Sequence, residues 1–368
     1  MESNKSLRIL GTRGVPAQHG GFETFAEHLA LYLAENGWNV TVYCQDEGSG
    51  RAFESEWQGI KLIHFPIKNK GAPGTIIFDW KTTLHAARHQ DRILTLGYNT
   101  AVFCLLYRLK GLKNIINMDG LEWKRGKWSI FARLWLYINE RAGCLLGNYL
   151  VADHPEIKNH LATRVNAEKI VMIPYGADSI DSADEKLIVQ YGLLPQQYAV
   201  VIARPEPENS VLEIVSAFSA RQRNQKLVVL GDFSKADPRY RDQVYAAANE
   251  AVVFPGAIYD QQVVKALRFH ACLYVHGHQV GGTNPSLVEA LGAGAPVLAH
   301  DNRFNRWVAG DGNVYFADMR ACAQAFDRLF DNPALLRSMR EHNRERHRAT
   351  FTWDRILAQY AKILLEKI

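Results

Sequence analysis

The sequence has few cysteines and no long apolar run. Its 368 residues include five cysteines, which are widely spaced and form no C-x-x-C pair. This usage favours reduced, buried thiols over a disulfide framework or a cysteine zinc site. No apolar run approaches the length of a membrane-spanning helix, and nothing near residue 1 resembles a signal peptide. We therefore expect a soluble, cytoplasmic protein.

Patterns for binding metals, dinucleotides and nucleic acids are also missing. The chain has no Asp-x-Asp element, which is expected where Mg²⁺ holds a diphosphate. His276 and His278 lack carboxylate or thiolate companions at a metal-ligand spacing. The loop from Gly11 to Gly21 lacks the G-x-G-x-x-G spacing of a dinucleotide fingerprint. No nucleic-acid-binding module is recognisable. We expect metal-free chemistry with no bound cofactor and no nucleic-acid partner.

The length and the apolar content predict two domains. A chain of 368 residues exceeds one ordinary core, and 47% apolar residues suffice for two. Short apolar strands alternate with helical stretches in both halves, which predicts an α/β fold of two Rossmann-like αβα domains. The strands are expected at 7–10, 40–44, 61–65, 92–96, 114–118 and 145–153 in the first half, and at 199–203, 226–231, 252–255, 271–276 and 296–299 in the second.

A glycine-rich loop that leads into a helix forms the clearest candidate site. Gly281, Gly282, Thr283 and Asn284 precede Pro285, which suits the first turn of a helix because it has no N–H to lose. The N–H groups at this helix end favour a phosphate. Glu289 lies about one turn inside the helix, where its carboxylate can meet a ribose hydroxyl. The pattern suits a nucleotide sugar, although a glycine-rich turn beside a solvated glutamate explains it equally well.

The sequence LVEALGAGAPVLA at 287–299 resembles the second half of the signature of the family 4 retaining glycosyltransferases. In that signature two acidic residues stand eight positions apart. Glu289 matches the second acid, which in the family binds the ribose of the donor, whereas Gly281 replaces the first. The resemblance implies the GT-B architecture, in which two Rossmann-like domains face each other across a cleft.

The first loop carries the most specific resemblance. Gly20 and Gly21 match a glycine pair that lets the backbone of these transferases approach the donor diphosphate. The sequence at 11–30, GTRGVPAQHGGFETFAEHLA, resembles those of a subgroup that includes bacterial rhamnosyltransferases of capsule and O-antigen assembly. The resemblance implies transfer of L-rhamnose from a dTDP-linked or UDP-linked donor. His19 and Glu23 flank the pair and are open to ligand contact, or Glu23 stabilises the helix N-terminus.

Arg204 follows a predicted strand where the family has an arginine that holds the donor diphosphate. A guanidinium can bind a diphosphate through two hydrogen bonds and stabilise the leaving group. Asn209 takes the place of the family's lysine, so Lys265 or Arg303 is a candidate for the lost charge. A structural ion pair of Arg204 is the alternative.

Asp119 stands where related transferases often have a histidine, so it is a candidate catalytic residue that accepts or removes the proton of the acceptor hydroxyl. A turn-capping aspartate is the alternative. Tyr98 follows a neighbouring strand, and a basic, tryptophan-rich stretch follows Asp119. This stretch has the composition of a surface for anionic lipid headgroups, or of an amphipathic helix with a core face. Its candidate residues on the acceptor and membrane side, with Tyr98, are Trp123, Lys124, Lys127 and Trp128.

From this resemblance we expect a metal-independent retaining glycosyltransferase. It would transfer the sugar to a polyprenyl-diphosphate-linked saccharide, with possible peripheral contact to the inner face of the plasma membrane. The expected domains are residues 1–172, residues 173–350 and a C-terminal helix at 351–368 that crosses back to the first domain. In the family, the leaving phosphate takes the proton of the acceptor.

Two other functions fit the same architecture. A nucleotide-sugar epimerase would need acidic groups that remove a carbon-bound proton, and Asp119, Glu206 and Glu208 are available. A non-catalytic sugar-binding module would explain the departures at Gly281 and Asn209.

Overall fold

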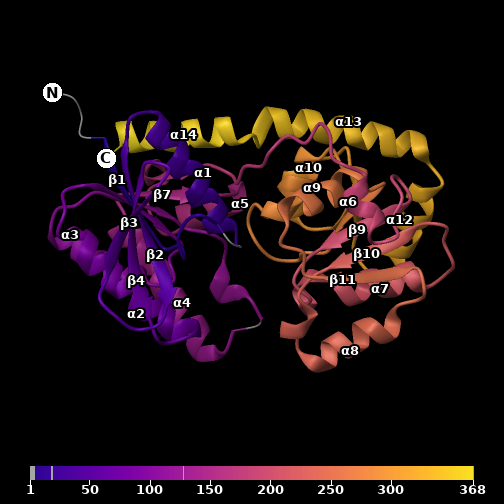
Figure 1. The fold of residues 1–368 in the computed structure, drawn as a ribbon, viewed down its shortest axis with the longest axis horizontal. Helices are drawn as coiled ribbons and strands as arrows, with labels where there is room; N and C mark the ends of the chain where they lie inside the picture. The colour runs from indigo at the N-terminus through magenta and orange to yellow at the C-terminus, as the bar shows by residue number, and fades with distance from the viewer. Residues whose placement is uncertain (1–4, 18–19, 127, 368) are drawn as a thin grey trace. The chain divides into compact units, whose positions relative to one another are not determined.

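The chain forms two compact units, each built around one β-sheet (Figure 1). The computed structural model describes residues 5–17, 20–126 and 128–367. Unit 1 comprises Met1–Pro174 with Trp353–Ile368, and unit 2 comprises Tyr175–Thr352. The α/β fold expected from the sequence is confirmed.

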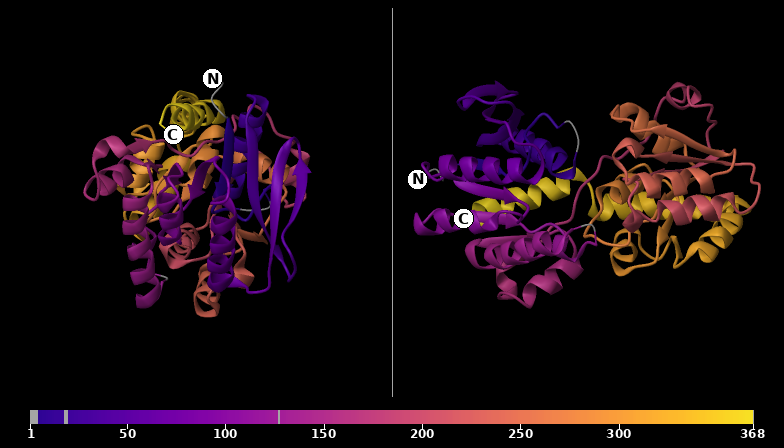
Figure 2. Two further views of the ribbon diagram at one scale, coloured as in Figure 1. Left: turned by 90° about the vertical axis from the view of Figure 1, so that its left-hand side faces the viewer. Right: turned by 90° about the horizontal axis from the view of Figure 1, so that it is seen from below.

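Unit 1 holds an eight-stranded sheet in the order β3-β4-β2-β1-β5-β6-β7-β8. All its neighbouring strands are parallel except the hairpin of β3 and β4, which lies at one edge (Figure 2). β1 is central, and its Leu7 pairs with Val40 on one side and Arg92 on the other. The strands are β1 (Ser6–Leu10), β2 (Asn39–Glu47), β3 (Phe53–Trp57), β4 (Ile60–Ile67), β5 (Arg92–Leu96), β6 (Asn114–Asn117), β7 (Tyr149–Ala152) and β8 (Ile170–Met172).

Helices cover both faces of this sheet. The connection from β1 to β2 runs in the opposite direction along the sheet from the connection between β4 and β5. Right-handed crossovers therefore place their helices on opposite faces. Figure 1 shows α1 with α14 above the sheet, and α2 and α4 below it. The helices are α1 (Gly21–Glu35), α2 (Gly71–Ala86), α3 (Leu105–Leu109), α4 (Ile130–Leu146), α5 (Pro155–Ala162) and α14 (Trp353–Glu366), with short 3₁₀ turns at Ala101–Cys104, Glu122–Lys124 and Ala167–Lys169.

The C-terminal helix α14 completes the core of unit 1. The Tyr360 ring packs 4.6 Å from the Phe25 ring of α1, and the Trp353 ring stacks 4.3 Å from His28. The Nδ2 group of Asn117, at the end of β6, donates a 2.8 Å hydrogen bond to Tyr360 Oη. The buried face of α14 consists of Trp353, Ile356, Leu357, Tyr360, Ile363 and Leu364.

Unit 2 holds a six-stranded parallel sheet in the order β11-β10-β9-β12-β13-β14. Successive residues of β9 enter opposite cores, because side chains alternate along a strand. Tyr198 and Val200 join a core with α9 and α10, whereas Ala199 and Val201 join a core with α7 and α12. The strands are β9 (Tyr198–Ile202), β10 (Lys226–Leu230), β11 (Val252–Gly256), β12 (Leu273–His276), β13 (Val297–His300) and β14 (Val314–Phe316).

The helices of unit 2 include the glycine-loop helix of the sequence analysis, α10. It runs from Pro285 to Gly292, as the proline and the glycines predict. The others are α6 (Lys186–Val189), α7 (Val211–Ser219), α8 (Pro238–Ala247), α9 (Gln261–His270), α11 (Arg303–Ala309), α12 (Met319–Phe330) and α13 (Pro333–Thr350), with 3₁₀ turns at Pro207–Asn209 and Phe233–Lys235.

One predicted strand was wrong at its start. We expected a strand over 145–153, but α4 continues to Leu146 and β7 begins only at Tyr149. A short apolar run such as Leu145-Leu146 fits a helix end and a strand start equally well, so periodicity alone does not separate the two. The prediction also omitted β3, β8 and β14, of which β3 is an exposed edge strand with little apolar content.

All five cysteines are buried and free, in agreement with the expectation of buried thiols. Burial raises the pKa of Cys44 and Cys144 to about 11. Within residues 5–17, 20–126 and 128–367, every helix is too short or too polar to span a bilayer.

The substitution Tyr360→Phe tests the attachment of α14. It removes the oxygen that accepts from Asn117 Nδ2 and leaves that donor buried without a partner, which costs on the order of 1–3 kcal/mol. We expect a lower melting temperature in thermal unfolding followed by circular dichroism. Tyr245→Phe is the matched control, because Tyr245 is 43% exposed. Equal melting temperatures for the two variants would contradict the role of Tyr360.

Candidate functional site

In unit 2 the strand order reverses next to β9. The chain passes from β9 to β10 on one side, whereas β12 pairs with β9 on the other. Open α/β sheets bind ligands beyond the carboxyl ends of their strands at such a switch point. The two loops that leave this point are residues 203–210 after β9 and residues 277–284 after β12.

Arg204 lies in the first of these loops and is exposed. Its side chain forms no ion pair with any residue in the described part of the chain, so the alternative of a structural ion pair is not what the structure has. Asn209 is buried, and its Nδ2 group donates a 2.8 Å hydrogen bond to the carbonyl oxygen of Arg204. In the place of the family's lysine, this asparagine shapes the backbone that carries Arg204.

The two loops are joined by hydrogen bonds. Ser210 Oγ donates to the carbonyl oxygen of Gly277 at 2.8 Å, and the N–H of Gln279 donates to the carbonyl oxygen of Glu208 at 2.9 Å. A side chain at Gly277 would collide with the backbone of Asn209. The arginine loop and the glycine loop therefore form one supported surface.

The glycine loop leads directly into α10. Asn284 is the N-cap residue, and its side chain accepts from the N–H of Ser286 at 3.0 Å. Thr283 is buried and Gly282 is partly exposed. Gly281 has φ of 148°, a backbone conformation that favours glycine. An acidic side chain at this position would strain the loop, which is a physical reason for the missing first acid.

Glu289 lies on α10 beside an arginine that the sequence analysis missed. Arg268 of α9 is only 5% exposed and forms an ion pair with Glu289 Oε2, whereas the Glu289 side chain is 34% exposed. Arg268 also donates to Ser286 Oγ at 3.2 Å, and Tyr274 Oη lies 2.6 Å from the same oxygen. This network fixes the carboxylate at one position along α10.

The burial of Arg268 could have been predicted from the sequence. Arg268 follows Val263, Val264, Ala266 and Leu267, which are all buried on α9. A charged residue next to the apolar face of a predicted helix requires a buried partner. Lys265, which we considered for the lost charge, pairs instead with Asp178 at 2.9 Å, and the Arg303 guanidinium lies 5.1 Å from the Phe304 ring.

The segment 301–306, which follows β13, supports the glycine loop. Asp301 pairs with Arg306, whose Nη2 atom donates to Asp301 Oδ2 at 2.8 Å. Asn302 and Asn305 donate to the carbonyl oxygen of His278 at 2.9 and 2.8 Å. Arg346 of α13 donates to two carbonyl oxygens at the end of α11.

In unit 1 the strand order reverses next to β1, which pairs with β2 on one side and β5 on the other. Gly20 precedes α1 with φ of 114°, and Gly21 is the first residue of α1. Glu23 lies in the first turn of α1 and accepts from the N–H of Arg13 at 3.2 Å. His19 lies outside the described residues.

Asp119 adopts a left-handed backbone conformation with φ of 50°, which is uncommon for a residue other than glycine. Its N–H donates to Asn117 Oδ1 at 3.0 Å, so the side chain that holds Tyr360 of α14 also holds this turn. Tyr98 does not reach the surface. It is 1% exposed, and its hydroxyl accepts from the N–H of Glu122 at 2.9 Å. Its role is therefore to support the segment after Asp119.

The tryptophan-rich segment is anchored by a buried carboxylate. Trp123 Nε1 donates to Glu140 Oε2 at 2.6 Å, and His160 Nε2 lies 3.0 Å from Glu140 Oε1. Burial opposes ionisation of Glu140, but the hydrogen bonds from His160 and Trp123 outweigh it and lower its pKa. Lys124 lies 5.2 Å from the Trp123 ring, and Trp128 Nε1 donates to Glu122 at 3.3 Å. Lys127 lies outside the described residues.

The next helix, α4, leaves one apolar face uncovered. This exposed apolar face consists of Ile130 (77% exposed), Phe131 (84%), Leu134 (55%) and Ile138 (47%). The opposite face packs in unit 1 through Leu136, Asn139, Glu140, Gly143 and Cys144. The alternative interpretation, in which the apolar residues of this stretch are core, is therefore wrong for the exposed apolar face.

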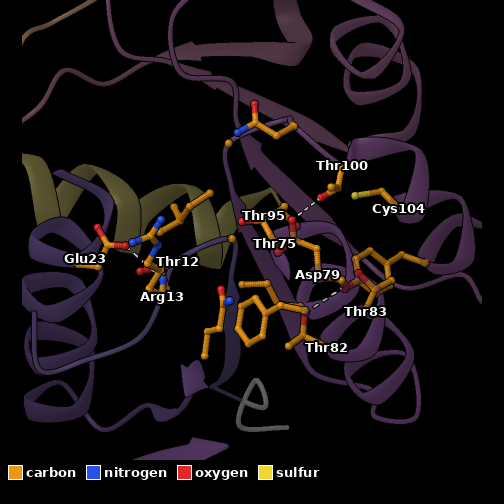
Figure 3. Close-up of a pocket in the computed structure, with 18 residues that line it drawn as sticks. Thr12, Arg13, Glu23, Thr75, Asp79, Thr82, Thr83, Thr95, Thr100 and Cys104 are labelled. Atoms are coloured by element: carbon orange, nitrogen blue, oxygen red, sulfur yellow. Dashed lines mark hydrogen bonds between the residues drawn. The ribbon is translucent and has the colours of Figure 1, made fainter. Parts of the chain in front are cut away.

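A cavity of about 230 Å³ lies at the carboxyl ends of β1 and β5, and the sequence analysis did not predict it (Figure 3). Asp79 of α2 points into it, and its Oδ2 atom accepts from Thr100 Oγ1 at 2.8 Å. Burial raises the pKa of Asp79 to about 6, although the hydrogen bond from Thr100 lowers it. In the described part of the chain, no cluster of three His, Cys, Asp or Glu side chains is arranged to hold a metal ion.

Comparison with known families and structures gives two family matches. Residues 185–346 match the glycosyl transferases group 1, and residues 4–178 match a family described as a domain of unknown function (DUF1972). Among curated proteins, none is similar enough to the chain to count as a match.

Three solved structures share the fold across nearly the full chain. Sucrose-phosphate synthase from Thermosynechococcus elongatus has a TM-score of 0.77 at 17% identity, covering 98% of both chains. A glycosyltransferase from Rickettsia africae has a TM-score of 0.74 at 16% identity, covering 100% of this chain and 99% of that one. Anabaena HepE in complex with UDP-glucose has a TM-score of 0.77 at 14% identity, covering 98% of both chains. The group 1 match lies within unit 2, and the three solved structures support the two-unit, Rossmann-like GT-B fold.

Proposed function

We propose that the protein is a retaining, metal-independent glycosyltransferase that uses a nucleotide diphosphate sugar. We further propose dTDP-L-rhamnose as the donor and a polyprenyl-diphosphate-linked saccharide of bacterial surface polysaccharide synthesis as the acceptor. The resemblance of residues 11–30 to rhamnosyltransferases supports rhamnose as the donor sugar. The binding of UDP-glucose by HepE supports a nucleotide sugar as substrate.

One observation carries the proposal. The exposed Arg204 guanidinium, which forms no ion pair with the described residues, and the N-terminus of α10 both lie at the switch point of the unit 2 sheet. Both attract anions, because the guanidinium is always charged and the helix N-terminus presents N–H groups. A diphosphate with its two negative charges suits this pair.

Glu289 would bind the deoxyribose of the dTDP-linked donor. Its Oε2 atom is held by Arg268, whereas Oε1 accepts no hydrogen bond from the described residues. The 3′-hydroxyl of the deoxyribose can donate to that second oxygen. Because Arg268 already neutralises the carboxylate, Glu289 repels the nearby diphosphate less than a lone carboxylate would.

The reaction breaks the bond between the anomeric carbon and the diphosphate oxygen. A hydroxyl oxygen of the acceptor forms a new bond to that carbon on the same face, and its proton passes to the leaving diphosphate. Arg204 would stabilise the charge that develops on the leaving group. Asp119 would accept a hydrogen bond from the acceptor hydroxyl.

The substitution Arg204→Ala tests this assignment. Loss of one preorganised donor at a developing oxyanion lowers kcat by about 10²–10³-fold, and we expect a loss of at least 100-fold here. The assay measures release of nucleotide diphosphate from a panel that includes dTDP-rhamnose and UDP-glucose, with and without a lipid-linked saccharide. Arg239→Ala is the matched control, because Arg239 is an exposed arginine of α8.

Three results would contradict the proposal. Full activity of the Arg204→Ala variant would remove the role of the guanidinium. An epimerised nucleotide sugar formed without acceptor would favour the epimerase, and binding without turnover would favour the sugar-binding module.

We also propose that the exposed apolar face of α4 contacts the cytoplasmic surface of the membrane. Four large apolar side chains there are 47% to 84% exposed, and Lys124 lies in the preceding turn. An apolar helix face flanked by a cation and by tryptophans suits the interface of an anionic bilayer. Such contact would bring the protein to an acceptor carried on a lipid.

The double substitution Ile130→Ser with Phe131→Ser tests membrane contact. Each side chain contributes on the order of 1–2 kcal/mol when it leaves water, so we expect at least tenfold weaker binding to phosphatidylglycerol vesicles in cosedimentation. Leu194→Ser with Met319→Ser is the control, because these residues of unit 2 are 54% and 50% exposed. If both variants bind as the unsubstituted protein does, the exposed apolar face has another role.

A further inference from the structure

The cavity beside Asp79 occupies the switch point of the unit 1 sheet. Its walls come from the ends of β1 and β5, which are neighbours in the sheet, and from α2 (Figure 3). The two strand ends approach closely. Gly11 has φ of 81°, and a side chain there would collide with the carbonyl oxygen of Leu96. The cavity is therefore built into the fold at the place where open α/β sheets bind ligands.

The walls are rich in hydroxyl groups and include two aromatic rings. Thr75, Thr95 and Thr100 line the cavity, together with Phe78 and Tyr107. Hydroxyl groups exchange hydrogen bonds with a polyol, and ring faces cover the C–H groups of a pyranose. A purely apolar ligand would leave these polar groups without partners.

The charges disfavour an anionic ligand. Among the lining residues, the cation is Arg13, whereas Glu23 and Asp79 are carboxylates. A phosphate in this cavity would meet two like charges and one opposite charge. The ligand that suits the cavity is neutral.

One carboxylate oxygen of Asp79 accepts no hydrogen bond from the described residues. The Oδ2 atom receives the hydrogen bond from Thr100, but the Oδ1 atom receives none from the described residues. A partly desolvated carboxylate is unfavourable unless donors meet it, which is the reason for its raised pKa of about 6. A ligand hydroxyl would supply the missing donor.

We infer that this cavity binds a neutral pyranose ring of the acceptor saccharide, and that Asp79 accepts hydrogen bonds from its hydroxyl groups. The assignment of that ring to the acceptor rests on the proposed transferase function, whereas the binding of a pyranose does not. Asp79 acts as a binding residue that holds the acceptor and takes no proton from the reacting hydroxyl.

The experiment measures the affinity of the full chain for methyl glycosides by saturation-transfer NMR titration. The probes are methyl α-L-rhamnopyranoside, methyl α-D-glucopyranoside and methyl α-D-galactopyranoside. We expect at least one to bind, and its affinity to fall at least tenfold in Asp79→Asn, because a charged acceptor becomes a neutral amide. Asp354→Asn, an exposed aspartate of α14, should bind as the unsubstituted protein does.

The pH dependence provides a second readout. The carboxylate is the stronger acceptor, so the affinity should decrease as the pH falls through about 6, and this dependence should vanish in Asp79→Asn. Thr100→Val keeps the side-chain volume and removes the donor to Oδ2. It should raise the pH at which affinity is lost.

Folding of the variant is checked by its melting temperature. A carboxyl whose pKa is higher in the folded than in the unfolded chain destabilises the protein as the pH rises from about 4 to about 6. Asp79→Asn should therefore melt higher than the unsubstituted protein at pH 7.5, and this advantage should shrink at pH 4. If Asp79→Asn fails to fold, Thr100→Val takes its place in the titration.

The outcomes separate this inference from the proposed function. Unchanged glycoside affinity in Asp79→Asn, or no binding of any glycoside to the unsubstituted protein, overturns the inference. Affinity for UDP and dTDP is measured alongside, and its absence counts against the proposed function alone. If Asp79→Asn weakens binding of dTDP-rhamnose but not of dTDP, the cavity holds the donor sugar and the acceptor assignment is wrong.

Discussion

The reversal of strand order beside one central strand determines where each unit can bind a ligand. At β1 and at β9 the chain leaves in one direction and later returns on the other side, so two loops diverge and leave polar groups at the strand ends. In unit 1 this point is a hydroxyl-lined cavity with excess negative charge. In unit 2 it carries the exposed guanidinium of Arg204 and the N-terminus of α10. The same topology thus places side chains of opposite net charge at the two switch points.

Buried side chains position the residues of both candidate sites. Asn209 fixes the backbone of Arg204, and Arg268 fixes Glu289. Asn117 joins α14 to the turn of Asp119 through its two side-chain groups. Each of these residues is buried, so each one costs stability unless its hydrogen bonds are formed. The geometry of the loops and the stability of the core are therefore coupled.

The sequence predicted the regular elements better than the site. Periodicity and glycines located α10 and most strands, because these signals are local. The positions of Arg204 after β9 and of Glu289 about one turn inside α10 were predictable for the same reason. The ion pair of Glu289 with Arg268, the burial of Tyr98 and the cavity at Asp79 were not, because each depends on residues that are distant in the sequence. The end of α4 was misplaced because an apolar pair suits a helix and a strand alike.

Unit 1 is assembled from two stretches of chain that are separated by all of unit 2. Its core includes Tyr360 and five further apolar side chains of α14. A ribosome that has delivered residues 1–174 has therefore not yet delivered the helix that covers α1. The second unit can finish folding while the first still exposes apolar surface, and the emergence of α14 then closes it. The core of unit 1 can therefore be completed only after all of unit 2 has been synthesised.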